Sequence, residues 1–317
     1  MSVVYFIGSY KCWKQSERLV DRLLESEQAQ VVIHHDSARS KWVSEGSLSN
    51  ARVHTLFLMQ GLEWGTASSA ELLLRSLEWI ETNLEYEWVV YLSEQDYPLR
   101  PISEIERDLS ESEVDCFLEG GPVEWGSPFP SEAEGLTRYH YSFSVFKDEG
   151  SEAEIWQQRK SQLSRPRLEE GRVIMPPLIA RATEGHWWIG RYIGWPYTCD
   201  TRLYAGLLWG NLRRCAVKRV LLFYQNYPHI WHHLSQTMHA SEAIWHTAIY
   251  NNPRLRVSAD NRRLILWEKK TDPRPGIWSR KDFDLLARSG KDFARKFAIG
   301  KEEDGILDLI DTHLLHT

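Results

Sequence analysis

Short hydrophobic runs alternate with helix-like stretches through the first 118 residues. Five runs have the length and composition of buried strands: Val3–Ile7, Val31–Ile33, Val53–Leu58, Trp88–Leu92 and Val114–Leu118. Between them, apolar side chains recur at three- and four-residue steps, which is the spacing of an amphipathic helix. Strands that alternate with helices predict an α/β fold, with a mostly parallel central sheet and helices on both faces.

The pattern changes after residue 118. Residues 119–200 are rich in turns, and Tyr139–Phe146 alternates like an antiparallel strand. Two roles stay open for this region: an insertion that shapes an acceptor cleft, or plain surface. Beyond Arg202 the periodicity is helical, and we expect helices over Leu208–Tyr224 and Ala240–Tyr250. The carboxyl-terminal part of the chain is therefore predicted to be mainly helical.

Composition excludes some classes of function. The chain has 317 residues, 42% of them hydrophobic, which is enough for one large domain or two modest ones. A net charge of −6 gives no sign of a nucleic-acid binder, and the apolar runs are too short to cross a bilayer. The amino terminus does not resemble a signal peptide, and the four cysteines are scattered, so we expect reduced thiols and a cytoplasmic protein.

Acidic side chains follow two of the predicted strands. His34 and Asp36 come directly after the second strand, and Asp96 follows the strand that ends at Leu92. Ligands of open α/β sheets bind at the carboxyl ends of the strands. Asp36 is suited to accept from a ribose hydroxyl or a uracil N–H, and His34 to pack on a ring or donate to it. The alternative is a solvated strand end. No glycine-rich phosphate loop occurs anywhere in the sequence.

Two further segments carry candidate chemistry. Glu242 lies at the start of a predicted helix, where the helix dipole favours a carboxylate, so it is expected to stay ionised and to serve as a base. Arg295 and Lys296 lie between Phe293 and Phe297, whose four-residue spacing is expected to anchor one face of a turn and fix both cations for a phosphate. The alternatives are an ordinary first-turn glutamate and a solvated basic patch.

No metal site is expected. His229, His232 and His233 share one helical face, but no further ligand type adjoins them. Asp282–Asp284 spells the D-x-D pattern that holds manganese in many nucleotide-sugar transferases. Here Ser279 and Asp282 also have the spacing of a capping box, which places the two aspartates on a helix surface.

Six segments in order resemble the core-2/I-branching β-1,6-N-acetylglucosaminyltransferase family, which includes peptide O-xylosyltransferases. They are VVIHHDSAR, LEWGTASSAELLLRSLEWI, VVYLSEQDYPLRPISEI, YAGLLWGNLRR, ASEAIWHTAIYNNP and FARKF, and they extend over residues 3–297. The third is the sharpest match, to the family's Leu-Ser-Gly-x-Asp-Tyr-Pro-Leu signature, although Glu94 replaces the usual glycine. In the fourth, Leu207 and Leu208 replace the family's usual polar pair, which leaves the acceptor open. In the fifth, Ser241 replaces an aspartate, which keeps the base but alters its neighbour.

The resemblance implies a GT-A-like fold and inverting, metal-independent transfer of GlcNAc or xylose from a UDP-sugar, the donor substrate, with no cofactor. Glu242 becomes the general base, and Lys296, Arg295 and Arg263 neutralise the diphosphate. His34, Asp36 and Asp96 are expected to contact or frame the nucleotide, with Asp96 either a direct ligand or a loop anchor. Glu119 and Trp209 are expected on the acceptor side.

A single glycosyltransferase domain in three parts follows from the resemblance. Residues 1–118 are expected to bind the nucleotide, 119–250 to hold the acceptor and the base, and 251–317 to close a basic tail over the diphosphate. The acceptor would be a glycan, a lipid-linked saccharide or a peptide, without a transmembrane segment but with possible peripheral attachment to a membrane. Two alternatives stay open: a catalytically silent sugar-binding protein on the same scaffold, and a hydrolase with paired carboxylates.

Overall fold

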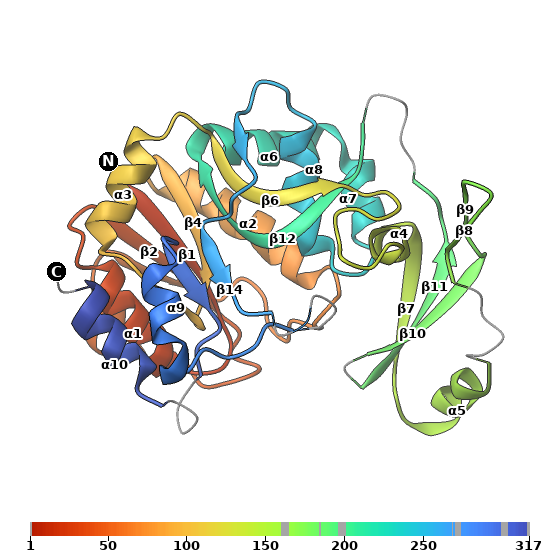
Figure 1. Ribbon diagram of the computed structural model, residues 1–317, viewed down its shortest axis with the longest axis horizontal. Helices are drawn as coiled ribbons and strands as arrows, with labels where there is room; N and C mark the ends of the chain where they lie inside the picture. The colour runs from red at the N-terminus through yellow and green to blue at the C-terminus, as the bar shows by residue number, and fades with distance from the viewer. Residues whose placement is uncertain are drawn as a thin grey trace.

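The computed structural model describes residues 2–159, 165–183, 185–195, 201–267, 269, 274–298 and 304–315. A seven-stranded sheet forms its centre, in the order β13-β6-β12-β4-β1-β2-β3 (Figure 1). Its strands are β1 (Val3–Ser9), β2 (Ala29–His35), β3 (Val53–Leu56), β4 (Trp88–Ser93), β6 (Cys116–Pro122), β12 (Tyr204–Arg213) and β13 (Val257–Ser258). Strands β1 to β4 run parallel, whereas β12 is antiparallel to β4 and β6. The predicted mixed α/β architecture is confirmed.

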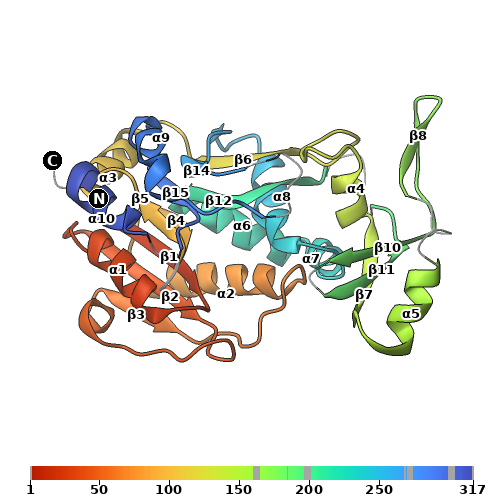
Figure 2. The same cartoon turned by 60° about the horizontal axis from the view of Figure 1, so that its bottom comes forward.

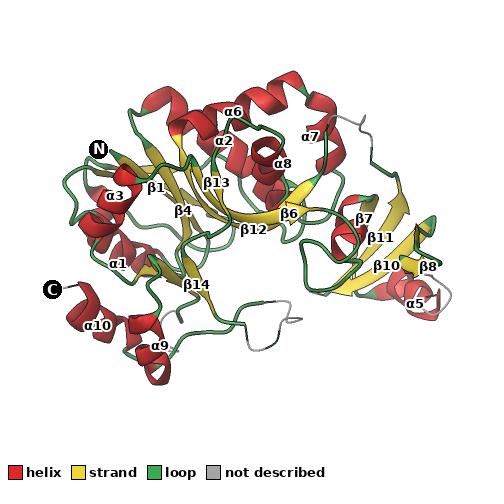
Figure 3. Cartoon of the chain, turned by 45° about the horizontal axis from the view of Figure 1, so that its top comes forward, coloured by secondary structure: helices red, strands yellow, loops and turns green. Residues whose placement is uncertain are grey.

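Helices cover both faces of this sheet (Figure 3). One face packs against α1 (Trp13–Leu23), α3 (Ile102–Glu111), α9 (Phe283–Arg288) and α10 (Ile306–Ile310). The other packs against α2 (Ser68–Asn83), α6 (Arg214–Asn226), α7 (Pro228–Leu234) and α8 (Ile244–Tyr250). Short turns complete this body: η1 (Gly46–Ser49), η3 (Ala240–Glu242), η4 (Arg280–Asp282) and η6 (Asp311–Leu315). The two faces bury separate apolar clusters, so the sheet is the shared floor of two cores.

A small second sheet lies at the carboxyl end of β4. It has the order β14-β15-β5, with β5 (Asp96–Pro98), β14 (Arg263–Ile265) and β15 (Phe293–Arg295). Since β5 follows β4 after two residues, this sheet brings the distant segments of β14 and β15 against the loop of Glu94 and Gln95, which we call the signature loop. It is the feature that delivers the carboxyl-terminal cations to the strand ends.

An arm extends from the main body (Figures 1 and 2). Its sheet has the order β10-β11-β7, with β7 (Tyr141–Lys147), β10 (Leu178–Thr183) and β11 (His186–Tyr192), all antiparallel. The hairpin of β8 (Arg167–Glu169) and β9 (Arg172–Ile174) and the helix α5 (Gly150–Arg159) belong to it, and α4 (Glu134–Tyr139) leads into it. The antiparallel strand predicted over Tyr139–Phe146 is thereby confirmed.

Two local predictions were wrong. The expected helix over Leu208–Tyr224 is a strand as far as Arg213, and helix α6 begins only at Arg214. Because β12 lies between β4 and β6 with helices on one side, its residues form a near-continuous apolar run, which periodicity alone cannot distinguish from a helix. Phe293 and Phe297 do not share a helical turn: Phe293 lies in β15, although both rings are fully buried.

Side-chain hydrogen bonds lie at the starts of η4 and α2. Ser279 and Asp282 form the predicted capping box, with both reciprocal hydrogen bonds present. In α2, Ala67 occupies the cap position, and the preceding Thr66 hydroxyl accepts from the N–H of Ser68, the first helical residue, at 3.3 Å. The same hydroxyl donates to the Glu63 carbonyl in the preceding loop, at 2.9 Å.

Candidate active site

A buried carboxylate organises the edge where β1, β2 and β4 end. Glu94 follows β4, and its side chain accepts hydrogen bonds from the backbone N–H groups of Tyr10, Lys11 and Cys12, at 3.2, 2.8 and 3.1 Å. The Ser9 hydroxyl also donates to it, at 2.7 Å. Glu94 therefore fixes the loop between β1 and α1 against the end of β4. Its negative charge is stabilised by hydrogen bonds from the protein itself.

Asp96 anchors the signature loop. Its Oδ2 accepts from the Ser93 N–H and hydroxyl, at 2.7 and 2.5 Å, and the residue is fully buried. Its Oδ1 lies 3.4 Å from the Arg295 Nε. Of the two roles left open for Asp96, the structure therefore places it as an anchor of the loop and as the counter-ion of Arg295.

Asp36 anchors a second loop. Its oxygens accept from the backbone N–H groups of Ala38, Gly61 and Leu62, at 3.1, 2.8 and 2.8 Å. Burial would raise the pKa of this carboxyl, but the three N–H donors and the nearby Arg39 outweigh burial and lower it. The carboxylate thus joins the end of β2 to the loop that precedes α2.

His34 presents unsatisfied nitrogen atoms. Its side chain is 1% exposed, and neither ring nitrogen has a hydrogen-bond partner among the described residues. Burial lowers its pKa to about 4, although Asp36 opposes this, so the ring is neutral at physiological pH. Gly8 is its neighbour on β1. A buried imidazole without a partner is costly in a protein interior, and a ligand group would relieve that cost.

Four cations gather beside this edge. Burial and the positive charges of Arg295, Lys11 and Arg274 together lower the pKa of Lys296 to about 8, against the opposing effect of Asp96. Arg295 is buried, and burial lowers its pKa as well. Repulsion between these positive charges costs free energy, and an anion bound among them would offset that cost.

Arg263 is not part of this cluster. Its guanidinium donates to the Asn211 Oδ1 at 2.6 Å and to the backbone carbonyls of Tyr91 and Asn261 at 3.0 and 2.6 Å. Burial lowers its pKa to about 10. It links β14 to β4 and β12 inside the protein, so we assign it a structural position and leave it out of the site.

Aromatic rings connect the cations to the segment of the predicted base. The Arg295 guanidinium lies 3.7 Å from the centre of the Trp209 ring, which stacks on Tyr91 at 5.1 Å. Tyr91 in turn meets the edge of Trp245 at 5.7 Å. Trp245 is three residues beyond Glu242. Trp209 is buried in this row and supports Arg295, rather than lying open on an acceptor surface.

Glu242 ends the short turn η3, which packs against α2 and β12. Its Oε2 accepts from the Arg138 Nη1 at 2.5 Å. Burial raises the pKa of Glu242, and Arg138 only partly offsets that effect. Glu242 lies in the first turn of η3 and two residues before α8, close to the predicted helix start, and burial opposes its charged form there.

Arg138 is itself held by a second carboxylate. Its Nε donates to the Glu134 Oε1 at 2.7 Å, and Arg181 on β10 donates to the same oxygen at 3.0 Å. Burial raises the pKa of Glu134, but the two arginines outweigh it and lower the pKa. Glu242, Arg138, Glu134 and Arg181 thus form a chain of alternating charge from the turn η3 to the arm.

Glu119 lies apart from this chain. It follows Leu118, which packs in the core against α6 and α8, so the Glu119 side chain points to the opposite face of β6. There its Oε2 accepts from the Asn261 Nδ2 at 2.9 Å. The structure does not bring Glu119 to Glu242, and we leave it out of the proposed site.

The residues that sequence reasoning missed come from loops and from α4. Lys11 and Arg274 are exposed basic residues in irregular segments, and no periodicity marks them. Glu134 and Arg138 have helical i, i+4 spacing, which predicts their own pairing but not the contact with a residue 104 positions away.

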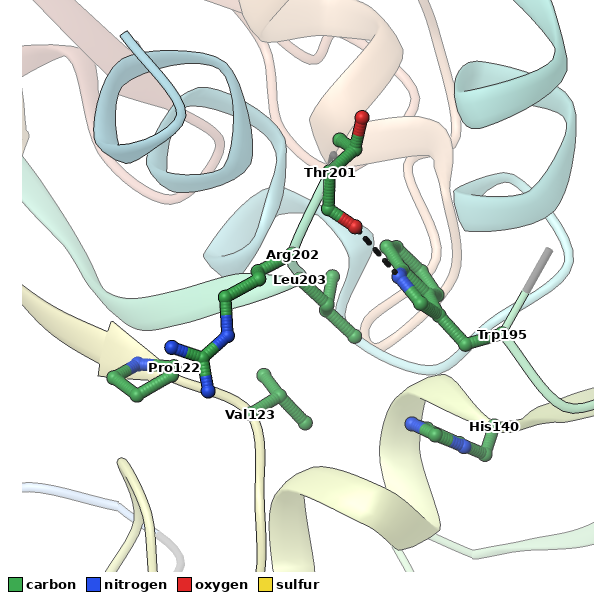
Figure 4. Close-up of a pocket in the computed structure, with 7 residues that line it drawn as sticks. All are labelled: Pro122, Val123, His140, Trp195, Thr201, Arg202 and Leu203. Carbon is green, nitrogen blue, oxygen red and sulfur yellow. Dashed lines mark hydrogen bonds between the residues drawn. The ribbon is translucent and has the colours of Figure 1, made fainter. Parts of the chain in front are cut away.

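A separate cavity of about 240 Å³ lies near the carboxyl end of α4 (Figure 4). The Trp195 indole N–H donates to the Thr201 carbonyl at one wall, and His140 faces Trp195. No residue predicted from the sequence lines this cavity. The candidate site is instead the open edge formed by the strand ends and η3.

Comparisons with known proteins add no family. No protein-family model matches the chain, and no curated protein shows significant similarity to it. Across the described ranges, no helix has the length and apolar character needed to cross a bilayer. In the same ranges, His, Cys, Asp and Glu side chains form no group of three or more that could hold a metal ion.

Proposed function

We propose that this chain is an inverting, metal-independent glycosyltransferase with a GT-A-like fold. It moves GlcNAc or xylose from a UDP-sugar to a hydroxyl group of a glycan, lipid-linked or peptide acceptor. The observation that carries the proposal is the position of Lys11, Arg295 and Lys296 beside the strand ends, where the Gln95 side chain joins Lys11 to the segment that follows β15. A diphosphate is the ligand whose charge suits close cations, and strand ends are where nucleotides bind in open α/β sheets.

The chemical step uses one carboxylate and the cations. Glu242 accepts the proton of the acceptor hydroxyl as that oxygen forms a bond to the anomeric carbon of the sugar. The bond from this carbon to the β-phosphate oxygen breaks on the opposite side, and UDP leaves with the electron pair. Arg295 and Lys296 stabilise the charge that develops on the diphosphate. Attack opposite the leaving group inverts the anomeric centre.

The raised pKa of Glu242 suits this role. A general base is most effective when its pKa approaches the working pH, and burial moves this carboxyl in that direction. Trp64 forms an edge-to-face contact with His239, three residues before Glu242, at 4.5 Å. Its side chain is 42% exposed and offers a flat face to a sugar.

The nucleoside is expected at the end of β2. The two unpaired nitrogens of His34 can satisfy a carbonyl and an imide N–H, which are the groups that uracil presents. Asp36 then acts through the backbone, because its oxygens hold Gly61 and Leu62 in place. The donor therefore extends from His34 to the cations, with its sugar directed toward Glu242.

The test replaces the base. UDP release from UDP-GlcNAc and UDP-xylose is measured with pools of glycoside and Ser/Thr peptide acceptors. Glu242→Gln is expected to lower turnover about 10²- to 10⁴-fold while the Kd for UDP stays unchanged. Glu169→Gln, on the hairpin of the arm, is the matched control. Normal turnover by the Glu242→Gln protein would show that the base is assigned wrongly.

Two alternatives give different results. A catalytically silent binding protein would bind UDP-sugars, as judged by a rise in Tm, but wild type would release no UDP from them with any acceptor. A hydrolase needs a second acid, and Glu134 is the nearest candidate. The Glu134 Oε1 accepts from both Arg138 and Arg181, so this carboxylate is used in ion pairs within the protein, which favours transfer over hydrolysis. We place the reaction in the cytoplasm as part of the same proposal.

A further inference from the structure

The arm meets the site through one cross-strand pair. Arg181 on β10 lies directly opposite Trp188 on β11. Arg181 donates to Glu134, as described above. Trp188 packs against Gly65: a Cβ added to this glycine would lie 3.1 Å from the indole ring. The Gly65 carbonyl also accepts from the His239 N–H at 2.7 Å. Each member of the pair is therefore one residue removed from a partner of the Glu242 region: Arg181 through Glu134 to Arg138, and Trp188 through Gly65 to His239.

We propose that Arg181 and Glu134 are positioning residues for Glu242, which act through Arg138 and couple the arm sheet to the carboxylate. The inference rests on the proposed function, in which Glu242 is the base. Arg138 has two carboxylates to choose between, 2.5 Å and 2.7 Å from its nitrogens. The ion pair of Arg138 with Glu134 competes with its ion pair with Glu242. Because Arg181 also donates to Glu134, it weakens the attraction of Glu134 for Arg138.

The charges around Glu242 support this reading. Among the described residues, the elements packed against η3 carry several other ionisable groups. They are Glu71, Arg75, Glu78 and Glu81 on α2, Tyr204 and Arg213 on β12, and His246 and Tyr250 on α8, with Tyr139 and His239 close by. Of the charged groups, Arg138 and Glu134 are the ones that shift the pKa of Glu242. The pKa of His239 and of His246 is lowered to about 3, mainly by burial, so both imidazoles are neutral. The titration of Glu242 is therefore governed by Arg138 and by whatever holds Arg138.

Opposite effects follow for the two positioning residues. Glu134→Gln leaves the whole charge of Arg138 to Glu242, so the pKa of Glu242 falls. Arg181→Gln removes the competing cation, and Glu134 then holds Arg138 more strongly, so the pKa of Glu242 rises. Each shift is expected to be about 0.5 to 1 pH unit. In Glu134→Gln the direct charge effect of Glu134 on Glu242 is also lost, which acts in the same direction as the change at Arg138. A merely structural role would lower stability or activity in both variants without shifts of opposite sign.

The experiment measures Glu242 directly. The side-chain carboxyl of Glu242 is titrated by carbon-13 NMR in glutamate-labelled protein, with Glu242→Gln to assign its resonance. The pH profile of kcat/KM is measured beside it. Activity needs the ionised base, so its acid limb moves to lower pH in Glu134→Gln and to higher pH in Arg181→Gln. Arg181→Lys keeps the cation and is expected to restore the wild-type titration.

Matched controls separate the possible failures. Arg167→Gln and Glu169→Gln make the same charge changes on the arm hairpin, where the two residues pair with each other, and are expected to leave Glu242 unmoved. If Glu134→Gln and Arg181→Gln shift the titration in the same direction, or not at all, the coupling is refuted whatever the activity. If the NMR shifts are opposite but wild type transfers no sugar, the coupling stands and the proposed function fails.

Discussion

Lys296 is the residue on which the proposed diphosphate site depends most. It is half-buried, close to three other cations, and its pKa is lowered to about 8. A phosphate bound beside Lys296 would stabilise the charged ammonium form and raise this pKa. The neighbouring Arg295 lies between Asp96 and the Trp209 ring, so its side chain is fixed before a ligand arrives.

The lowered pKa predicts a pH dependence of UDP binding. Below about pH 8 Lys296 carries its charge and affinity is complete; above it, the free protein loses the charge and affinity falls by up to about tenfold per pH unit. Isothermal titration calorimetry between about pH 7 and pH 9 measures this. Lys296→Arg keeps its charge throughout and is expected to bind with constant affinity. Parallel loss of affinity in both proteins would rule out Lys296 as the group responsible.

At the scale of elements, Glu94 joins the start of α1 to the end of β4. Glu94→Gln keeps one acceptor but loses the charge that three backbone N–H groups share. We expect the free energy of unfolding to fall by about 2–4 kcal/mol, since hydrogen bonds to a buried charge are worth more than neutral ones.

Urea unfolding measures that loss as a lower midpoint with an unchanged slope. The control is Glu113→Gln, whose side chain is 92% exposed. It is expected to change stability by less than about 0.5 kcal/mol. Equal midpoints for the two variants would show that Glu94 does not hold the loop.

Sequence patterns predicted the elements better than the contacts between them. The alternation of strands and helices as far as residue 118 was read correctly, because each element there has its own period. Strand β12 was missed because it is buried in the middle of the sheet, where a strand and a helix leave the same apolar run. The capping box at Ser279 was predicted because both partners lie within one turn.

The site divides along the same line. Asp36 was expected to contact a ligand, and Asp96 either to do so or to anchor its loop. In the structure Asp36, Glu94 and Asp96 all accept from backbone N–H groups, and no sequence pattern reveals which use a buried carboxylate has. The contact between Glu242 and Arg138 depends on how α4 and η3 meet in three dimensions. Long-range pairings of this kind have no local period to read.

For the whole molecule, the fold brings three distant basic segments to one place. The Glu94 loop positions Lys11, and the small β14-β15-β5 sheet carries Arg295 and Lys296 to the end of β4. The Gln95 side chain ties the two together: its Oε1 accepts from the Lys11 Nζ at 3.2 Å, and its Nε2 donates to the Phe297 carbonyl at 3.2 Å. The ends of the main sheet's strands thus form the base of the proposed site, and the small sheet positions Arg295 and Lys296. The arm and α4 supply the charged residues that pair with Glu242 or with its partner Arg138.

The central claim is that fixed cations, in place of a divalent ion, hold the diphosphate of a UDP-sugar. Calorimetric titration of UDP into chelator-treated protein tests it most directly, with wild type compared against Lys296→Met and the exposed control Lys281→Met. The account predicts binding without metal, weakened at least about tenfold by Lys296→Met and unchanged by Lys281→Met. No binding until manganese is added, or equal affinity in all three proteins, would contradict it.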